Sequence, residues 1–345
     1  MLCYTPITKG TTKDMQTATA VAPANIAFVK YWGVADAALT LPLNESVSMN
    51  LDRCLTTTTV QFDGRLNADE LLISLHGENE RPATGSFLAR VVAQLDRVRA
   101  LAGTETRAHV RSHNNFPADA GIASSAAGFA ALTTAACAAL DLHLDERALS
   151  ILTRQSGSGS ACRSIPGGFT YWRNDGTDNG SYAVSVAPPE HWALTNVVAV
   201  VSTDAKRVGS ADNHRRAHTS PYLPARLSEV PSRIEQTLQA IRDRELPLLG
   251  QICEADALSL HVIAMTAQPP TLYWQPGTLA VMQALGRWRD EGLHGYFTID
   301  AGPNVHVICA QDDAAEIEQR LQALPEVQFT IANGPGAGAR VVDQR

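Results

Sequence analysis

A loop of small residues runs directly into an alanine-rich stretch between Asn115 and Phe129, and this segment has the composition of an anion site. Small side chains let main-chain N–H groups approach a ligand closely, and the dipole and unpaired N–H groups of a helix start favour a bound anion. Hydroxyl groups in the first turn could also bond a phosphate or ligate Mg²⁺. The candidates for this contact are Ala120, Gly121, Ala123, Ser124 and Ser125. A capped, tightly packed helix without a ligand is the alternative for this loop taken alone.

A second loop of small residues covers Ser156–Arg163, with the sequence Ser-Gly-Ser-Gly-Ser-Ala-Cys-Arg, and could open a further helix. Two such loops could surround a polyanion, one holding nucleotide phosphates and the other the phosphate of a small acceptor. Arg163 lies one turn into this segment, where it could make bidentate contact with a carboxylate or a phosphate. A surface arginine paired with an acid is the alternative for Arg163.

Two further charged residues stand at the ends of apolar strands. Asp300 lies between such a strand and a Gly-Pro turn, where a partly buried carboxylate could accept or orient the proton of a hydroxyl. An aspartate that only caps the turn is the alternative. Lys30 is followed by Tyr31 and Trp32, which would partly bury it and strengthen its electrostatic effect. A solvated lysine at a strand end is the alternative for Lys30.

Hydrophobic periodicity predicts the elements that must position these residues. Apolar side chains recur at helical spacing over Ser86–Ala102, and Gly121–Leu140 is apolar nearly all round, which indicates a buried helix. Asp145 can cap the helix that follows, through about Arg154. The strands predicted in the first half of the chain are 20–29, 46–51, 55–62, 107–114, 167–172 and 181–186.

Pro188–His191 is the candidate domain boundary, so we predict two α+β domains, residues 1–190 and 191–345. A chain of 345 residues is long enough to bury two cores. The strands predicted after the boundary are 194–202, 295–299, 305–310 and 327–331, and the helices are 227–244, 248–265, 277–291 and 314–324. Gly334–Gly338 is interpreted as a tail loop.

Composition and charge restrict the class of protein. A hydrophobic content of 45% and a charged content of 18% are ordinary for a soluble globular protein. The net charge of −7 argues against non-specific binding of nucleic acid and gives no reason to invoke a membrane partner. The six cysteines are scattered without a C-x-x-C pair, which favours free thiols. Because the first 19 residues lack the apolar core of a secretory signal, and no uncharged apolar run has the length of a membrane span, we expect a cytoplasmic protein.

Four segments together resemble the GHMP small-molecule kinase superfamily and, within it, the diphosphomevalonate decarboxylase family. They follow one another in the family's order: Asn25–Gly33, Pro117–Gly128, Ser156–Ser164 and Tyr296–Asn304. The resemblance extends from about residue 20 to residue 310. It implies the GHMP kinase fold, in which an N-terminal domain with a left-handed βαβ crossover and a ferredoxin-like C-terminal domain enclose a cleft. It also implies a homodimer.

The resemblance implies a reaction in which ATP and Mg²⁺ phosphorylate a tertiary 3-hydroxyl group on a mevalonate 5-phosphate ester. Phosphate and CO₂ then leave, and an isopentenyl ester remains. A tertiary alcohol is a poor leaving group and its phosphate is a good one. Departure of the phosphate leaves positive charge on C3, and loss of CO₂ supplies the electrons of the new double bond.

The resemblance also implies residue roles. Asp300 is expected to position or deprotonate the 3-hydroxyl, Lys30 to neutralise nearby charge, and Arg163 to hold the substrate carboxylate. Catalysis of this kind consists mostly of positioning and charge stabilisation. ATP phosphates are assigned to the first loop, with Ser124 as a candidate Mg²⁺ ligand. The residues expected on the substrate side are Asn25, Tyr31, Ser158, Gly159, Ser160 and Ser210.

Two positions depart from the family pattern. Val34 stands where the family has a lysine that contacts the substrate diphosphate, and Ala211 stands where it has an arginine, although Ser210 is retained. A buried phosphate without a counter-charge is costly. We therefore expect mevalonate 5-phosphate as the substrate and isopentenyl phosphate as the product. His214 or Arg215 could instead replace the lost charge, which keeps mevalonate 5-diphosphate as the alternative substrate.

Two other activities compete with decarboxylation. One is a kinase that phosphorylates mevalonate or its phosphate without loss of CO₂, and the other is a catalytically silent, nucleotide-binding paralogue. In relatives that only phosphorylate, the catalytic aspartate is typically altered. Here Lys30, Arg163 and Asp300 are all present together with both loops, and this favours a decarboxylase.

Overall fold

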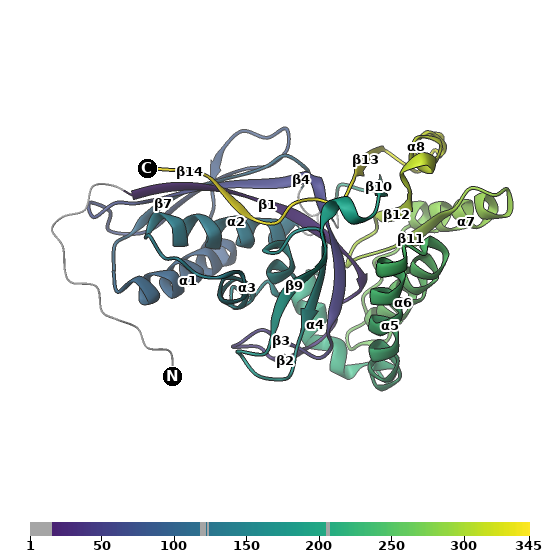
Figure 1. Ribbon diagram of the computed structural model, residues 1–345, viewed down its shortest axis with the longest axis horizontal. Helices are drawn as coiled ribbons and strands as arrows, with labels where there is room; N and C mark the ends of the chain where they lie inside the picture. Colours follow the sequence, from purple (N-terminus) through teal and green to yellow (C-terminus); the bar gives the residue numbers. More distant parts are fainter. Residues whose placement is uncertain (1–15, 118–121, 123, 205–207) are drawn as a thin grey trace.

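The computed structural model describes residues 16–117, 122, 124–204 and 208–345, and these residues form two large β-sheets with helices packed against them and one small two-stranded sheet (Figure 1). The larger sheet has eight strands and is built mainly from the N-terminal half of the chain, and the smaller has four strands from the C-terminal half. This architecture agrees with the predicted α+β class.

The larger sheet is organised around two long strands, β1 (Gln16–Val29) and β4 (Ser46–Phe62), which pair antiparallel. The sequence predicts two strands in place of β4, but the intervening residues 52–54 continue the strand because they include no glycine or proline to break it. The other strands of this sheet are β5 (Glu70–Ser74), β6 (Arg81–Pro82), β7 (Ala108–Asn114), β8 (Phe169–Arg173), β9 (Tyr182–Ala187) and β14 (Arg340–Gln344). A separate small hairpin consists of β2 (Val34–Asp36) and β3 (Leu41–Pro42).

Three helices cover one face of the larger sheet: α1 (Gly85–Ala102), α2 (Ser124–Ala139) and α3 (Glu146–Arg154) (Figure 1). The predicted buried helix is confirmed in α2, whose small alanine side chains pack against β1 and β4. The predicted cap is also confirmed, since Asp145 accepts a hydrogen bond from the Ala148 N–H at 2.7 Å. The segment expected to open a further helix forms only a short 3₁₀ helix, Gly159–Ser164.

The smaller sheet is antiparallel, with the strand order β11-β12-β10-β13. Its strands are β10 (Leu194–Val200), β11 (Gly295–Thr298), β12 (Val305–Ala310) and β13 (Phe329–Asn333). The helices of this half are α4 (Ser210–Arg216), α5 (Leu223–Asp243), α6 (Leu246–Thr266), α7 (Pro276–Asp290) and α8 (Ala314–Gln322). The short 3₁₀ helices are Pro189–His191, Ala217–Thr219 and Gln311–Asp313.

The end of the chain returns to the N-terminal half. After β13, the strand β14 pairs antiparallel with β1, with Ala18 opposite Gln344 and Val21 opposite Arg340 (Figure 1). The predicted tail loop at 334–338 is therefore a connection between the two sheets. Both backbone polar groups of Gly336 in this connection are hydrogen-bonded to the N-terminal half. The Gly336 N–H donates to the Asn50 carbonyl and the Gly168 N–H donates to the Gly336 carbonyl, both at 2.8 Å. Residues 340–344 thus belong to the N-terminal sheet.

One hydrophobic core cluster joins the two halves. It contains β1 residues such as Phe28, β10 residues such as Val198, and α5 and α6 residues such as Ile234 and Leu249. Helix α6 is long and apolar enough to cross a membrane by length and composition alone, but 56% of its most apolar window is buried inside the protein. Because its acidic residues are also paired with arginines, α6 is a helix of the protein core.

Candidate active site

An ion pair joins the end of β1 to the loop after β11. The Lys30 ammonium donates to the Asp300 carboxylate at 2.6 Å and to the Ala27 carbonyl at 2.9 Å. The side chain of Lys30 is buried, whereas that of Asp300 is 25% exposed. Burial by itself would raise the pKa of Asp300, but the positive charges of Lys30, His306 and Arg163 and the hydrogen bond from Lys30 outweigh it, so the net shift of this pKa is downward.

This ion pair forms one wall of a cavity of about 100 Å³ between the two halves of the molecule. Most of the residues singled out in the sequence meet here although they are far apart along the chain. The predicted site residues that line the cavity are Lys30, Tyr31, Ser125, Ser160, Arg163, Ser210 and Asp300. Among the described residues of its lining, Lys30 and Arg163 carry the positive charge and Asp300 the negative charge.

Arg163 is held in place by two buried polar residues of the larger sheet. Its guanidinium donates to the Asn25 side-chain oxygen at 2.9 and 3.2 Å and to the Ser46 hydroxyl at 2.6 Å. Asn25 in turn donates to the Ser164 hydroxyl at 2.8 Å. Burial lowers the pKa of Arg163. Asn25, predicted to touch the substrate, is therefore placed behind Arg163 rather than in the cavity lining, and Ser46 is a partner that the sequence analysis missed.

The second predicted loop, Ser156–Arg163, packs against the first loop and against two aromatic rings beside the cavity. The Ser158 hydroxyl lies 3.1 Å from the Ser125 hydroxyl, so the two loops meet at this point. A side chain at Gly159 would place its Cβ atom 2.7 Å from the Trp172 ring and 3.1 Å from the Tyr31 ring. Glycine at this position lets both rings close against the loop, and Ser160 and Arg163 are the loop residues that line the cavity.

A larger cavity of about 420 Å³ opens beside the start of α2, between β5, β7 and α1. Ser124 and Ser125 line it, and Ser125 lines the smaller cavity as well, so this serine stands between the two. The first turn of α2 carries no acidic residue that would oppose an anion. Ala120, Gly121 and Ala123, predicted to contact the same anion, lie outside the described residues.

The larger cavity also contains Arg90, which the sequence analysis missed. The Arg90 guanidinium lies 4.7 Å from the centre of the Phe129 ring, and burial lowers its pKa. The sequence does carry a signal for it, because Arg90 follows the apolar Phe87 by three residues, a spacing that puts both side chains on one face of α1. A cation on an apolar helix face points toward a buried site.

His214, which the sequence analysis considered as a replacement for the lost charge, lines the smaller cavity and joins the two halves of the molecule. Its Nδ1 accepts a hydrogen bond from the Gly33 N–H at 3.0 Å, and its ring stacks on Tyr31 with 4.1 Å between ring centres. Burial, with a contribution from Arg163, lowers the pKa of His214 to about 3. His214 is therefore neutral near pH 7. Its signal in the sequence is the four-residue spacing from Ser210 on one helix, which puts both side chains on one face.

His214 and Arg215 were the candidates to replace the positive charge that is absent at Val34 and Ala211. His214 is neutral and does not supply that charge. Arg215 is exposed and pairs with Asp212 on its own helix. Neither Val34 nor Ala211 is among the described residues that line the smaller cavity. Of the polar residues retained from the family pattern in this segment, Ser210 is the one at the cavity.

No group of three or more His, Cys, Asp or Glu side chains that could hold a metal occurs in the described part of the chain. Mg²⁺ seldom needs such a cluster when a polyphosphate supplies most of its oxygen ligands. The residues beside the two cavities fit this mode, because Ser124, Ser125 and Asp300 offer oxygen atoms around the path from one cavity to the other.

Comparison with known proteins identifies this combination of fold and site. Residues 22–183 match the family model of the diphosphomevalonate decarboxylase-like N-terminal domain, and residues 196–333 match that of the mevalonate 5-diphosphate decarboxylase C-terminal domain. Among curated relatives, the diphosphomevalonate decarboxylase of Candida albicans is 36% identical over 84% of this chain and 83% of the relative. The human diphosphomevalonate decarboxylase is 35% identical over 88% of this chain and 79% of the relative.

Solved structures give the same result. The mevalonate diphosphate decarboxylase of Staphylococcus aureus is 33% identical, with a TM-score of 0.88 over 96% of this chain and 99% of that chain. A structure described as MDDEF in complex with MVAPP, AMPPCP and magnesium is 36% identical, with a TM-score of 0.87 over 96% of this chain and 100% of that chain.

The fold and the composition of the cavity thus define an enzyme with the GHMP-type α+β architecture, which confirms the predicted fold class. More narrowly, the chain belongs to the diphosphomevalonate decarboxylase family and is an ATP-dependent decarboxylase. The family resemblance inferred from the four segments is confirmed. The preference for a monophosphate substrate is not supported by these relatives, whose names refer to the diphosphate.

Proposed function

We propose that this enzyme uses ATP to phosphorylate the 3-hydroxyl group of a mevalonate 5-phosphate ester and then releases phosphate and CO₂ to leave the isopentenyl ester. The observation that carries this proposal is the Lys30–Asp300 ion pair, 2.6 Å long, in a cavity that also contains Arg163. A carboxylate kept ionised beside two cations can receive or orient a hydroxyl proton while the cations stabilise the substrate's own negative charge.

In this proposal Asp300 faces the 3-hydroxyl, Arg163 binds the carboxylate that leaves as CO₂, and Lys30 balances the charge of Asp300. Ser125 contacts the transferred phosphate, because it lines both cavities. Arg163 suits its role because Asn25 and Ser46 fix its guanidinium before substrate arrives, so little ordering is needed on binding. These roles of individual residues are predictions.

ATP is assigned to the larger cavity, with its phosphates toward the start of α2 and toward Ser125. Ser124 and Ser125 would hold the phosphates and Mg²⁺, and Arg90 would lie near the nucleotide. When bound, Mg²⁺ neutralises charge on the phosphates. Solved relatives support the use of ATP. One of them, the mevalonate diphosphate decarboxylase of Enterococcus faecalis, is described by an ATP-binding mechanism that mevalonate diphosphate mediates. The homodimer and the cytoplasmic location stay predictions.

Mevalonate 5-diphosphate is the first candidate substrate. The named relatives are diphosphomevalonate decarboxylases, and two of them share 35% and 36% of their residues with this chain over more than four fifths of its length. Lys30, Tyr31, Arg163 and Ser210 line one cavity, and this agrees with the assignment.

Mevalonate 5-phosphate is the second candidate, and a specific observation favours it. The side chains of Val34 and Ala211 carry no charge, and His214, which lines the cavity and bonds to Gly33 beside Val34, is neutral. A second phosphate adds negative charge that a neutral wall does not balance. The monophosphate needs less positive charge at this end of the site.

One experiment separates these possibilities. The purified protein is incubated with ATP, Mg²⁺ and, in separate reactions, mevalonate, its 5-phosphate and its 5-diphosphate, while ADP and CO₂ are both measured. Equal amounts of ADP and CO₂ from the diphosphate support the first candidate, and from the monophosphate the second. ADP without CO₂ would make the protein a kinase. No turnover with any of the three would contradict the proposed function and favour the silent paralogue.

A further inference from the structure

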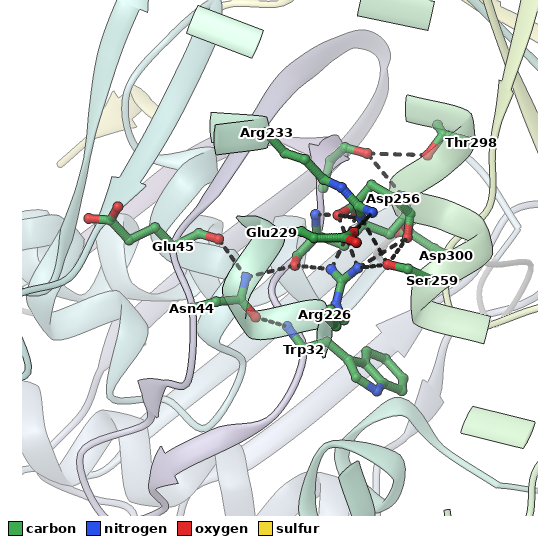
Figure 2. A network of polar contacts seen from close by, with 12 residues as sticks. Trp32, Asn44, Glu45, Arg226, Glu229, Arg233, Asp256, Ser259, Thr298 and Asp300 are labelled. Carbon is green, nitrogen blue, oxygen red and sulfur yellow. Dashed lines mark hydrogen bonds and ion pairs between the residues drawn. The ribbon is translucent and has the colours of Figure 1, made fainter. Parts of the chain in front are cut away.

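The main chain of Lys30 is held by two side chains from the C-terminal half of the molecule and one from the N-terminal half. The Lys30 N–H donates to the Asp256 carboxylate at 2.8 Å. The Lys30 carbonyl accepts from the Arg226 guanidinium at 2.9 Å and from the Asn44 side chain at 3.0 Å. Figure 2 shows Asp256 and Arg226 at the centre of this network, with Asp300 beside them. Both polar groups of the Lys30 backbone are therefore fixed by side chains from other elements, and we call this set of contacts the Lys30 clamp.

Asp256 and Arg226 themselves form an ion pair that is closed to solvent. Asp256 lies on α6 and Arg226 on α5, their side chains are 0% and 1% exposed, and they approach to 3.0 Å. Burying two charges is costly, and an apolar pair of similar volume often serves stability as well. The roles proposed for Lys30, Arg163 and Asp300 assign no function to the Asp256–Arg226 pair. A costly pair that touches the backbone of a site residue therefore needs another explanation.

Arg233 provides an internal comparison. It also lies on α5 and contacts the Asp256 carboxylate at 3.3 Å, but its side chain is 15% exposed. Its other partners are Ser259 and Glu229. No contact between Arg233 and Lys30 occurs among the described interactions. Arg226 and Arg233 thus share one carboxylate, and only Arg226 bonds to the Lys30 backbone.

We propose that Asp256 and Arg226 are positioning residues, which hold the end of β1 so that the Lys30 ammonium meets Asp300 at the catalytic cavity. The chain of contacts begins on α5 and α6, passes through the Lys30 backbone to its side chain, and ends on the loop after β11. All three of these elements belong to the C-terminal half, so the pair aligns a residue of the N-terminal half with a carboxylate of the C-terminal half. The proposal rests on the proposed function for its effect on turnover.

The pH response follows from the groups that face Asp300. These groups are Lys30 and Arg163 from the N-terminal half, His306 from β12, His214 from α4 and His261 from α6. Lys30 is the one that donates a hydrogen bond to Asp300 at 2.6 Å, and Coulomb attraction falls with distance. When Lys30 is displaced, Asp300 keeps its proton to a higher pH. Loss of the clamp therefore shifts the acidic limb of turnover upward in pH.

The first test uses Arg226→Met, Asp256→Asn and the control Arg233→Met. In Arg226→Met, the Asp256 carboxylate keeps Arg233 as a partner, which protects the fold. We expect kcat to fall about ten- to hundredfold in Arg226→Met and Asp256→Asn, as a displaced catalytic group can cause, with KM for ATP within about twofold. We also expect the acidic limb to rise by about half a pH unit or more. Arg226→Lys, which keeps one charged donor, should recover part of the loss.

The control decides between positioning and stability. Arg233→Met removes a partner of the same carboxylate, so it should lower thermal stability without changing kcat more than about twofold or moving the acidic limb. An equal loss of kcat in Arg233→Met and Arg226→Met would overturn the proposal, and so would an unchanged acidic limb in Arg226→Met.

A second test does not depend on turnover. The chain has four lysines, Lys9, Lys13, Lys30 and Lys206, so protein labelled with ¹³C at the lysine Cε has few NMR signals, and a Lys30→Arg variant assigns that of Lys30. We expect this signal to titrate with Asp300 at a higher pH in Arg226→Met than in the unmodified protein and in Arg233→Met. Identical titrations in all three proteins contradict the clamp. If the titration moves but no substrate turns over, the clamp stands and the proposed function fails.

Discussion

Asp300 combines two properties that seldom occur together in a carboxylate. It lies in a cavity where burial opposes ionisation, and it remains ionised because cations surround it, so the net shift of its pKa is downward. A base of this kind is charged throughout the physiological pH range. It loses function only as the pH falls through its lowered pKa, when it takes up a proton.

Replacing Asp300 by Asn tests its assignment, because asparagine has nearly the same shape and cannot receive the proton. We expect kcat to fall by about 10²- to 10⁴-fold, the usual contribution of a general base. Binding of ATP should remain within about twofold, measured by titration calorimetry. The exposed Asp312 gives the control variant Asp312→Asn, which should leave both quantities unchanged. Full activity of Asp300→Asn would remove the residue from the mechanism.

The charge at the far end of the substrate can be tested in the same way. The double variant Val34→Lys with Ala211→Arg adds two cations near the neutral His214. We expect the ratio of kcat/KM for the diphosphate to that for the monophosphate to rise at least about tenfold, since charge-assisted hydrogen bonds to phosphate are among the strong ones. The matched control is Val34→Met with Ala211→Gln, which adds length without charge. A ratio that stays constant in the charged variant contradicts the charge-based account of substrate choice.

At the scale of elements, α6 contributes more than an apolar surface. It places Asp256 against the Lys30 backbone, and one and a half turns later it buries His261 against the Tyr273 and Trp274 rings. Burial, followed by the charge of Lys30, lowers the pKa of His261 to about 3. An unfolded chain binds a proton at such a histidine near pH 6.5. The stability that His261 contributes is therefore complete above about pH 6.5 and is lost as the pH falls toward 3.

The variant His261→Gln should remove this pH dependence. Between pH 7 and pH 5 we expect the free energy of unfolding of the unmodified protein to fall by about 2 kcal/mol more than that of His261→Gln, measured by urea denaturation. His218, exposed on a short 3₁₀ helix, serves as the control through His218→Gln. An equal fall in the unmodified protein and in His261→Gln would contradict the buried, neutral state of His261.

The same elements show how much of the fold could be predicted from the sequence. Strands and helices whose signal is local were predicted well, including the α3 cap and the buried α2, because periodicity and capping depend on neighbouring residues. The continuity of β4 and the pairing of β14 with β1 were not predicted, because they depend on partners far along the chain. Likewise Lys30, Arg163 and Asp300 were found as candidates, but their meeting in one cavity was implied only by resemblance.

Three of the residues that the sequence analysis missed are charged side chains on helices. Arg90, Asp256 and Arg226 look like solvent-facing charges when read singly, since most charged residues are exposed. Their burial becomes visible only when the partner element is known. Asp256 could have been predicted most readily of the three, because an acid inside the long apolar helix α6 must find a cation.

At the scale of the whole molecule, the two halves share a hydrophobic core that includes residues of β1, β10, α5 and α6. The Lys30 clamp and the stack of His214 on Tyr31 add polar and aromatic contacts across the same boundary. Because the two halves share this core, we expect them to unfold together. The smaller cavity, which is lined by residues from both halves, is therefore built on a continuous packed body.

Removing β14 tests this view. A chain that ends at Gly338 would leave the outer edge of β1 unpaired, and we expect the free energy of unfolding to fall by about 2–4 kcal/mol, since several backbone hydrogen bonds are lost. Aggregation should also increase, because an unpaired strand edge is a template for pairing. The control Val341→Thr with Val342→Thr keeps the strand and changes only exposed side chains, so it should stay within about 1 kcal/mol. Unchanged stability of the shortened chain would contradict a structural role for β14.

The return of β14 to β1 also affects the order in which the protein can be completed during synthesis. Domains generally begin to fold in the order in which they leave the ribosome. Here β1 emerges among the first elements, whereas its partner β14 emerges only after every helix and strand of the other half. The nascent N-terminal half therefore keeps one open strand edge until β14 has been synthesised, and an open edge is a template for pairing with other chains.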